Sequence, residues 1–163
     1  MSSGSPQPDH RTSSSRIARR GLLFGGAAVL TAGAVGIGRW YILQANVGDG
    51  TLSAPDADKA VSTGALVLVD IRRPDEWADT GLPKGAVPID MRRDDFPQAL
   101  LAALGGDKDY PVALICARGV RSSRISARLS EAGFTKVLDV SEGMLGSRAG
   151  PGWLARGLPV TQP

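Results

Sequence analysis

Cys116 is the only cysteine of the chain, and it opens the heptapeptide C-A-R-G-V-R-S. An apolar run at 112–115 leads into it, and a stretch with helical character follows from Ser122 to Ala132. The backbone N–H groups of residues 117–122 can curl around such a sulfur, and the positive end of the helix dipole points at it. This setting stabilises a thiolate. A lone cysteine is more often a structural residue at the end of a core strand, but the glycine and arginines that follow favour sulfur chemistry.

The part of the chain expected to fold contains no imidazole that could activate this thiol. The only histidine, His10, lies in the polar N-terminal tail. A Cys-His protease and a Ser-His hydrolase are therefore excluded. Backbone amides, the helix dipole and the arginines 118, 121 and 124 must do the activation instead. A single cysteine also excludes an intramolecular disulfide and a cysteine-based metal cluster, and we expect neither a metal nor a cofactor.

The interval between Cys116 and Arg121 holds four residues. Tyrosine-type phosphatases have one residue more between their cysteine and arginine, so the smaller loop suits the terminal sulfur of a persulfide better than a phosphate. We expect a double displacement, in which Cys116 takes sulfur from an anionic donor such as thiosulfate and passes it to cyanide or a thiol. Arg118, with Arg121 as a second candidate, would attract the donor. This chemistry requires a sulfur that solvent can reach.

Apolar segments alternate with helical ones after residue 55, which predicts an α/β domain with a parallel sheet and helices on both faces. The predicted strands are 65–69, 86–89, 112–115 and 136–140, and the predicted helices are 54–62, a turn after Pro74, 98–104 and 122–132.

Three elements are expected to meet at the carboxyl ends of these strands: the cysteine loop, Asp70 with Arg72, and Ser141 to Met144. Asp70 could pair with an arginine of the loop, or it could cap the next turn. Asp75 and Glu76 are interpreted as solvated acids of a first helical turn.

The N-terminal third of the chain differs from the rest. Residues 1–15 are rich in serine, proline and glycine and are interpreted as a disordered tail. Residues 16–45 combine basic residues, including Arg19-Arg20, with an uncharged stretch at 21–38, as in a twin-arginine export signal or a membrane anchor. Ala32-Gly33-Ala34 fits a cleavage site, but retention as one membrane helix is also open. Residues 46–55 form a linker and 56–163 the folded domain.

The basic charge of the chain belongs to the leader. Residues before Asn46 carry five arginines and one aspartate, whereas the rest carries 14 basic and 15 acidic residues. The folded domain is therefore not expected to bind nucleic acid. The leader predicts a domain on the extracytoplasmic, periplasmic side, attached to the inner membrane or exported after cleavage, and it favours a protein partner there.

From about Leu66 to Pro163 the sequence resembles a single-domain rhodanese, of the rhodanese-like sulfurtransferase family. The matching stretches are L-V-D-I-R-R-P-D-E-W-A-D-T-G, K-G-A-V-P-I-D, C-A-R-G-V-R-S-S-R-I-S-A-R-L-S-E-A-G-F and G-W-L-A-R-G-L-P-V. The resemblance implies that Cys116 carries a persulfide, and that Asp70, Arg72 and Ser122 support the loop. By the same resemblance the persulfide cradle consists of Ala117, Arg118, Gly119, Val120 and Arg121.

The sequence departs from the family at two places. Gly81-Leu82-Pro83 stands where the family usually has Gly-His-Ile, and Glu142-Gly143 stands for the usual Gly-Gly. The segment from Leu145 to Gly152 is longer than usual and is expected to form a rim over the pocket.

An enzyme is the leading hypothesis, and a non-catalytic module for sulfur delivery or partner binding in a membrane-associated assembly is the rival. A phosphatase or arsenate reductase is disfavoured by the loop length and the lack of a second cysteine.

Overall fold

The computed structural model describes Met1 and residues 50–163. The predicted tail at 1–15, the predicted signal or anchor at 16–45 and the first residues of the linker lie outside the described residues. Within the described part, no helix combines the length and apolar character needed to cross a membrane.

The centre of the domain is a parallel sheet, as predicted. Its five strands run in the order β1-β6-β5-β2-β4, and every neighbouring pair is parallel. Their bounds are β1 Thr51–Leu52, β2 Val67–Asp70, β4 Val87–Pro88, β5 Val112–Ile115 and β6 Val137–Val140. Strands β3 (Leu82–Pro83) and β7 (Val160–Thr161) form a separate antiparallel pair that the sequence pattern did not predict.

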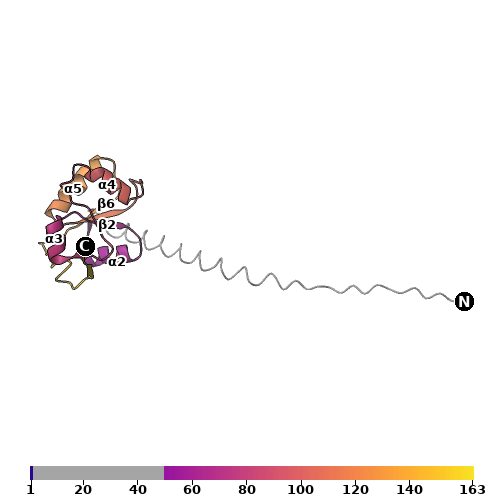
Figure 1. Ribbon diagram of the computed structural model, residues 1–163, viewed down its shortest axis with the longest axis horizontal. Helices are drawn as coiled ribbons and strands as arrows, with labels where there is room; N and C mark the ends of the chain where they lie inside the picture. Colours follow the sequence, from indigo (N-terminus) through magenta and orange to yellow (C-terminus); the bar gives the residue numbers. More distant parts are fainter. Residues whose placement is uncertain (2–49) are drawn as a thin grey trace. The chain divides into compact units, whose positions relative to one another are not determined.

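The described residues form four helices: α2 Ala54–Ser62, α3 Pro74–Thr80, α4 Phe96–Ala103 and α5 Val120–Glu131. Helix α2 lies on one side of the sheet and helices α4 and α5 lie on the other (Figure 1). Helix α2 begins as predicted, because Ser53 caps it and accepts a hydrogen bond from the backbone N–H of Asp56. Helix α5 begins two residues earlier than predicted, so Val120 and Arg121 belong to its first turn.

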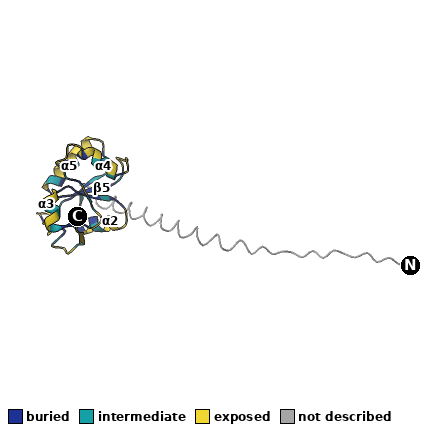
Figure 2. Ribbon diagram, viewed as in Figure 1, coloured by how far each residue is buried: buried dark blue, intermediate teal, exposed yellow. Residues whose placement is uncertain are grey.

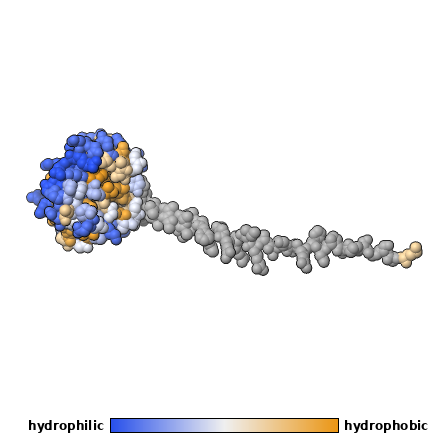
Figure 3. Space-filling model, in the orientation of Figure 1, coloured by the Kyte–Doolittle hydropathy of each residue, from blue (hydrophilic) through white to orange (hydrophobic). Residues whose placement is uncertain are grey.

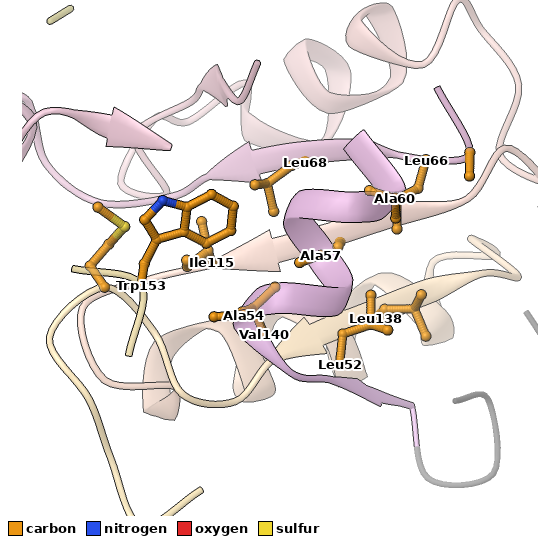
Figure 4. Packing of buried hydrophobic residues seen from close by; sticks show 13 residues of the cluster. Leu52, Ala54, Ala57, Ala60, Leu66, Leu68, Ile115, Leu138, Val140 and Trp153 are labelled. Atoms are coloured by element: carbon orange, nitrogen blue, oxygen red, sulfur yellow. The ribbon is translucent and has the colours of Figure 1, made fainter. Parts of the chain in front are cut away.

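The α2 face of the sheet has a tightly packed core (Figure 4). Ala54, Ala57 and Ala60 give α2 a smooth side, and each is fully buried. Small side chains let the helix approach the strands closely, so Leu68, Ile115 and the wide ring of Trp153 fill the remaining space. The core also includes Leu52, Ala65, Leu66, Ala113, Leu138, Val140 and Met144.

The other face of the sheet packs against α4 and α5. Phe96 and Leu100 of α4 meet Ile125 and Leu129 of α5 over the sheet, and Cys116 belongs to this second core. The buried strands and the exposed outer sides of these helices stand out in Figure 2. Because side chains alternate along a strand, residues of β5 and β6 are divided strictly between the two cores.

The folded domain starts earlier than the predicted boundary at residue 56. Thr51 and Leu52 pair with Asp139 and Val140 as edge strand β1, and Leu52 is buried. Residues 51–55 were assigned to the linker because the run is too short and too mixed to show a strand pattern. Pairing with β6 gives these residues an ordered structure.

Candidate active site

Cys116 follows the last residue of the central strand β5, and its loop ends where α5 begins at Val120. Gly119 turns the chain into the helix with a φ of 78°. A side chain there would overlap the carbonyl oxygen of Ser141, and a Cβ on Gly143 would come within 2.6 Å of the Ala117 oxygen. These two positions therefore require glycine, because the cysteine loop lies directly against the backbone of residues 141–143.

The first turn of α5 brings a hydroxyl to the sulfur and carries a cation beside that hydroxyl in the sequence. The hydroxyl of Ser122, which is fully buried, donates to Sγ of Cys116 at 3.4 Å and also reaches the Gly119 oxygen at 3.0 Å. The guanidinium of Arg121 donates to both carboxylate oxygens of Glu76, at 2.8 and 2.6 Å. Hydrogen bonding by Glu76, and to a lesser degree the charge of Cys116 and a hydrogen bond to it, raise the pKa of Arg121. The sulfur thus has a hydroxyl donor in contact, and the cation next to that donor in the sequence is fixed by Glu76.

The sulfur itself is covered, contrary to the expectation of an accessible thiol. Cys116 is only 1% exposed. It lies beneath a loop whose carbonyls at Cys116 and Ala117 accept hydrogen bonds from Met144 and Leu145, each 2.9 Å long. A donor can meet Sγ only after this cover moves. The expected ring of backbone amides around the sulfur stays a prediction.

Of the two roles expected for Asp70, pairing with an arginine of the cysteine loop is wrong, whereas the hydrogen bond that it accepts from the backbone N–H of Arg72, 3.1 Å long, agrees with capping of the next turn. Its carboxylate binds Arg72, with contacts of 3.0 Å to Nε and 2.7 Å to Nη2, and both residues are buried. Arg72 also donates to Thr80 at 2.7 Å and to the Gly81 oxygen at 2.7 Å. Because Asp70 also accepts from the backbone N–H of Arg72, its carboxylate is turned back along its own chain. The pair fastens α3 to the sheet.

Glu76 is the site residue that the sequence interpretation missed. The sequence interpretation treats both Glu76 and Asp75 as solvent-exposed acids. This is correct for Asp75, which is exposed and pairs with Arg73. Glu76 is 20% exposed and faces the cysteine loop from α3, where the hydrogen bond from Arg121 lowers its pKa. Asp70 and Arg72 therefore support the loop indirectly, by positioning the helix that carries Glu76. Neighbouring acids in a first turn look alike in sequence, and only the packing separates them.

Glu142 anchors the wall on which the loop rests. It is 2% exposed and accepts backbone hydrogen bonds from Ala54 at 3.2 Å and Gly152 at 3.1 Å. Arg156 adds two more, at 2.7 and 3.0 Å. Burial is the largest single effect on this carboxyl and raises its pKa, but the hydrogen bonds together outweigh burial and lower the pKa. Glu142 thus joins α2, the 145–152 segment and the C-terminal residues.

A groove of about 470 Å³ opens beside the loop. Its cations are Arg118 of the loop, Arg124 of α5 and Arg148 of the 145–152 segment, and three serine hydroxyls and Asp139 complete it. Within the described part of the chain none of these arginines has an ion pair shorter than 4.0 Å. Residues 147–149 of the 145–152 segment thus line this groove, and a rim over the cysteine itself stays a prediction. Hydrophilic side chains gather over the region of α5 in Figure 3.

The sequence matches the family described as "Rhodanese-like domain" over residues 53–149. A sulfurtransferase of Allochromatium vinosum is 29% identical over 113 residues, covering 66% of this chain and 89% of the relative. A tRNA uridine(34) hydroxylase of Synechococcus elongatus is 33% identical over 97 residues, covering 59% of this chain, and the match spans only 36% of the length of that protein.

Solved structures give the same result. The 30 kDa polysulfide-sulfur transferase homodimer of Wolinella succinogenes has a TM-score of 0.54 and 29% identity, covering 76% of this chain and 85% of that one. Fold, cysteine loop and sequence therefore agree, and the chain belongs to the rhodanese-like domain family.

Proposed function

We propose that this protein is a sulfurtransferase that moves sulfane sulfur from an anionic donor to a thiophilic acceptor through a persulfide on Cys116. The observation that carries the proposal is the contact of 3.4 Å between Sγ and the Ser122 hydroxyl at the end of the central strand, with the cation of Arg121 in the same first turn of α5. A hydroxyl donor and a cation both stabilise an anionic sulfur, whether it is the thiolate or the terminal sulfur of a persulfide. The sulfurtransferase relatives support this general activity.

The proposed cycle has two displacements. The thiolate of Cys116 attacks the outer sulfur of thiosulfate, a new S–S bond forms, and sulfite leaves with the electron pair of the broken bond. An acceptor thiolate or cyanide then attacks the terminal sulfur of the persulfide. That sulfur leaves as an organic persulfide or thiocyanate, and the Cys116 thiolate is restored. An organic persulfide or a polysulfide can replace thiosulfate, in which case a thiolate or a shorter polysulfide leaves instead of sulfite.

The charge of the groove supports an anionic donor. Arg118, Arg124 and Arg148 border it without a carboxylate partner in the described residues. Cations at the mouth of a site raise the local concentration of anions and their rate of encounter. We infer that the donor enters from this groove and that the loop must shift to admit it, because Cys116 is 1% exposed.

Intact-mass measurement tests the proposal. The full-length chain is incubated with thiosulfate, and separately with a low-molecular-weight persulfide, freed of small molecules and weighed. We expect a gain of one sulfur atom that cyanide removes, and no gain in Cys116→Ser. A wild-type protein that gains no sulfur from either donor would contradict the proposal, provided that a denatured sample shows a free thiol.

A non-catalytic module for sulfur delivery or partner binding is the second candidate. The covered sulfur favours it, because a binding module has no need of an open nucleophile. The match to a part of a longer tRNA uridine(34) hydroxylase also shows such a domain within a larger protein. Failure to load sulfur, together with copurification of a protein partner that survives Cys116→Ser, would select a partner-binding module, whereas loading without turnover would select a sulfur-delivery module.

We further propose that the domain acts on the extracytoplasmic side, with residues 16–45 as an export signal or an inner-membrane anchor. The support is the sequence of that segment, with Arg19-Arg20 before an uncharged stretch of 18 residues. Cell fractionation followed by the mass of the mature chain tests both points. A protein of full-length mass in the cytoplasmic fraction would refute the export of this domain.

A further inference from the structure

A buried acid next to the cysteine loop has no part in the cycle described so far. Asp139 of β6 is 6% exposed, and within the described structure its Oδ1 atom has no hydrogen-bond partner. It is also the one carboxylate among the described residues that line the groove. Burying an unsatisfied carboxyl costs stability, so its position calls for a role.

The sheet places Asp139 and Cys116 on the same side. Asp139 is the register partner of Leu114 on the neighbouring strand β5, and Cys116 follows Leu114 by two residues. Side chains two apart on a strand share a face. Leu114 and Cys116 belong to the core under α5, whereas Leu138 and Val140, the neighbours of Asp139, belong to the opposite core. Asp139 therefore projects toward α5, as Cys116 does.

Ser122 contacts the thiol from the side of the sheet toward which Asp139 projects. It is in the first turn of α5 and fully buried, and its hydroxyl lies 3.4 Å from Sγ of Cys116. Burial raises the pKa of Asp139, and hydrogen bonding by the same Ser122 hydroxyl offsets only part of this effect. The carboxylate of Asp139 is thus a stronger base than that of an exposed aspartate, and it lies on the side of the sheet that α5 covers.

We propose that Asp139 takes the thiol proton of Cys116 through the hydroxyl of Ser122. The S–H proton passes to Oγ of Ser122, and the hydroxyl proton passes to the carboxylate of Asp139. One negative charge thereby moves from oxygen to sulfur, no electron is gained or lost, and the serine is left unchanged. When a thiol acceptor leaves with the sulfur, the same steps in reverse can return a proton. Asp139 acts through Ser122 and is a positioning residue in this scheme.

The surroundings favour this exchange. The sulfur is 1% exposed, so water has little access to its proton, and no histidine lies in the described part of the chain. The charged groups around the pair are Arg121 with its partner Glu76, and Arg118, Arg124 and Arg148, which line the groove together with Asp139. The use of this relay in sulfur transfer rests on the proposed function, but the relay itself does not.

Alkylation of the full-length chain by iodoacetamide over a range of pH tests the relay without any sulfur donor. If Asp139 and Cys116 are coupled, the pair loses its two protons in two separate steps. In the pH range between these steps, the pair carries one negative charge, and part of that charge lies on the sulfur. The wild type should therefore keep a plateau of reactivity below neutrality. Asp139→Asn should lower the rate there by about tenfold or more. At alkaline pH it should react as fast as the wild type or faster, because a neighbouring negative charge is gone.

Two further variants complete the test. Ser122→Ala should also lose the acid-side plateau, and Asp139→Asn added to it should have no further effect there. Asp94→Asn, which makes the same charge change at an exposed position, should behave as the wild type. A rate lowered equally at all pH values in Asp139→Asn would indicate a merely structural role and overturn the proposal. If Asp139→Asn does not fold, Ser122→Ala decides the test, and a plateau that survives in Ser122→Ala would overturn the proposal. If the wild type fails to load sulfur but still differs from Asp139→Asn in its acid-side plateau, the proposed function is refuted and the relay is not.

Discussion

Replacement of Glu142 should both unfold the domain more easily and loosen its cysteine loop. Glu142→Ala removes the acceptor for the backbone N–H groups of Ala54 and Gly152, which are both buried. A buried donor left without a partner costs about 1–3 kcal/mol. The ion pair with Arg156, a side chain that is 33% exposed, adds less because solvent screens it. We therefore expect a loss of about 3–5 kcal/mol in the free energy of unfolding.

Urea unfolding of the full-length chain measures this loss, with the fluorescence of buried Trp153 and far-ultraviolet circular dichroism as independent signals. The corresponding fall in melting temperature is roughly 10–25 °C. Sulfur loading measured well below the transition should also slow, since Glu142 holds the wall formed by residues 141–143 against the loop.

Arg156→Ala is the matched control. It removes two hydrogen bonds from the same carboxylate but leaves both backbone donors satisfied, so it should cost only about 1–2 kcal/mol. Equal losses in the two variants would show that the ion pair alone stabilises the wall. A loss below about 1 kcal/mol in Glu142→Ala would refute the reasoning altogether.

Arg121→Ala should slow sulfur loading about ten- to hundredfold. It should cost at most about 1 kcal/mol of stability, because the Arg121 side chain is 31% exposed. A variant that loads sulfur at the wild-type rate would remove Arg121 from the mechanism. Since Arg121 lowers the pKa of Glu76, their pair stabilises the fold above the usual glutamate value of 4.5 and loses this contribution as the pH falls through the lowered pKa. The difference in unfolding free energy between wild type and Glu76→Gln should therefore vanish in acid. Burial raises the pKa of Asp139, so its ionisation destabilises the fold as the pH rises above 3.8. At neutral pH the Asp139→Asn variant should therefore melt at or above the wild-type temperature, and in strong acid the two proteins should melt together. Gly119→Ala should lose at least about 1–3 kcal/mol, because it combines a φ of 78° with overlap of the Ser141 oxygen, and an unchanged melting temperature would contradict this.

Much of the fold follows from local patterns in the sequence. The apolar run at 112–115 becomes β5 with the predicted bounds, because a strand buried on both faces has no polar alternation. Ser53, Pro55 and Gly64 delimit α2 for reasons of capping and backbone conformation. The short pairs β1 and β3–β7 could not be predicted, because two residues carry no periodicity and their partners are remote in sequence.

The sequence by itself determined the reactive element of this protein: a lone cysteine in a short glycine- and arginine-containing loop between a buried strand and a helix, without an imidazole. Which acids serve that loop was decided only by the tertiary structure. Asp70 turned to Arg72, Glu76 came to Arg121, and Asp139 came to the α5 side of the sheet beside Ser122. The physical reason is that carboxylates pair with whatever donor the packing brings within about 3 Å, and those donors lie up to 45 residues away in the sequence. Burial of the thiol is likewise a property of the assembled loop and its wall, which no local pattern encodes.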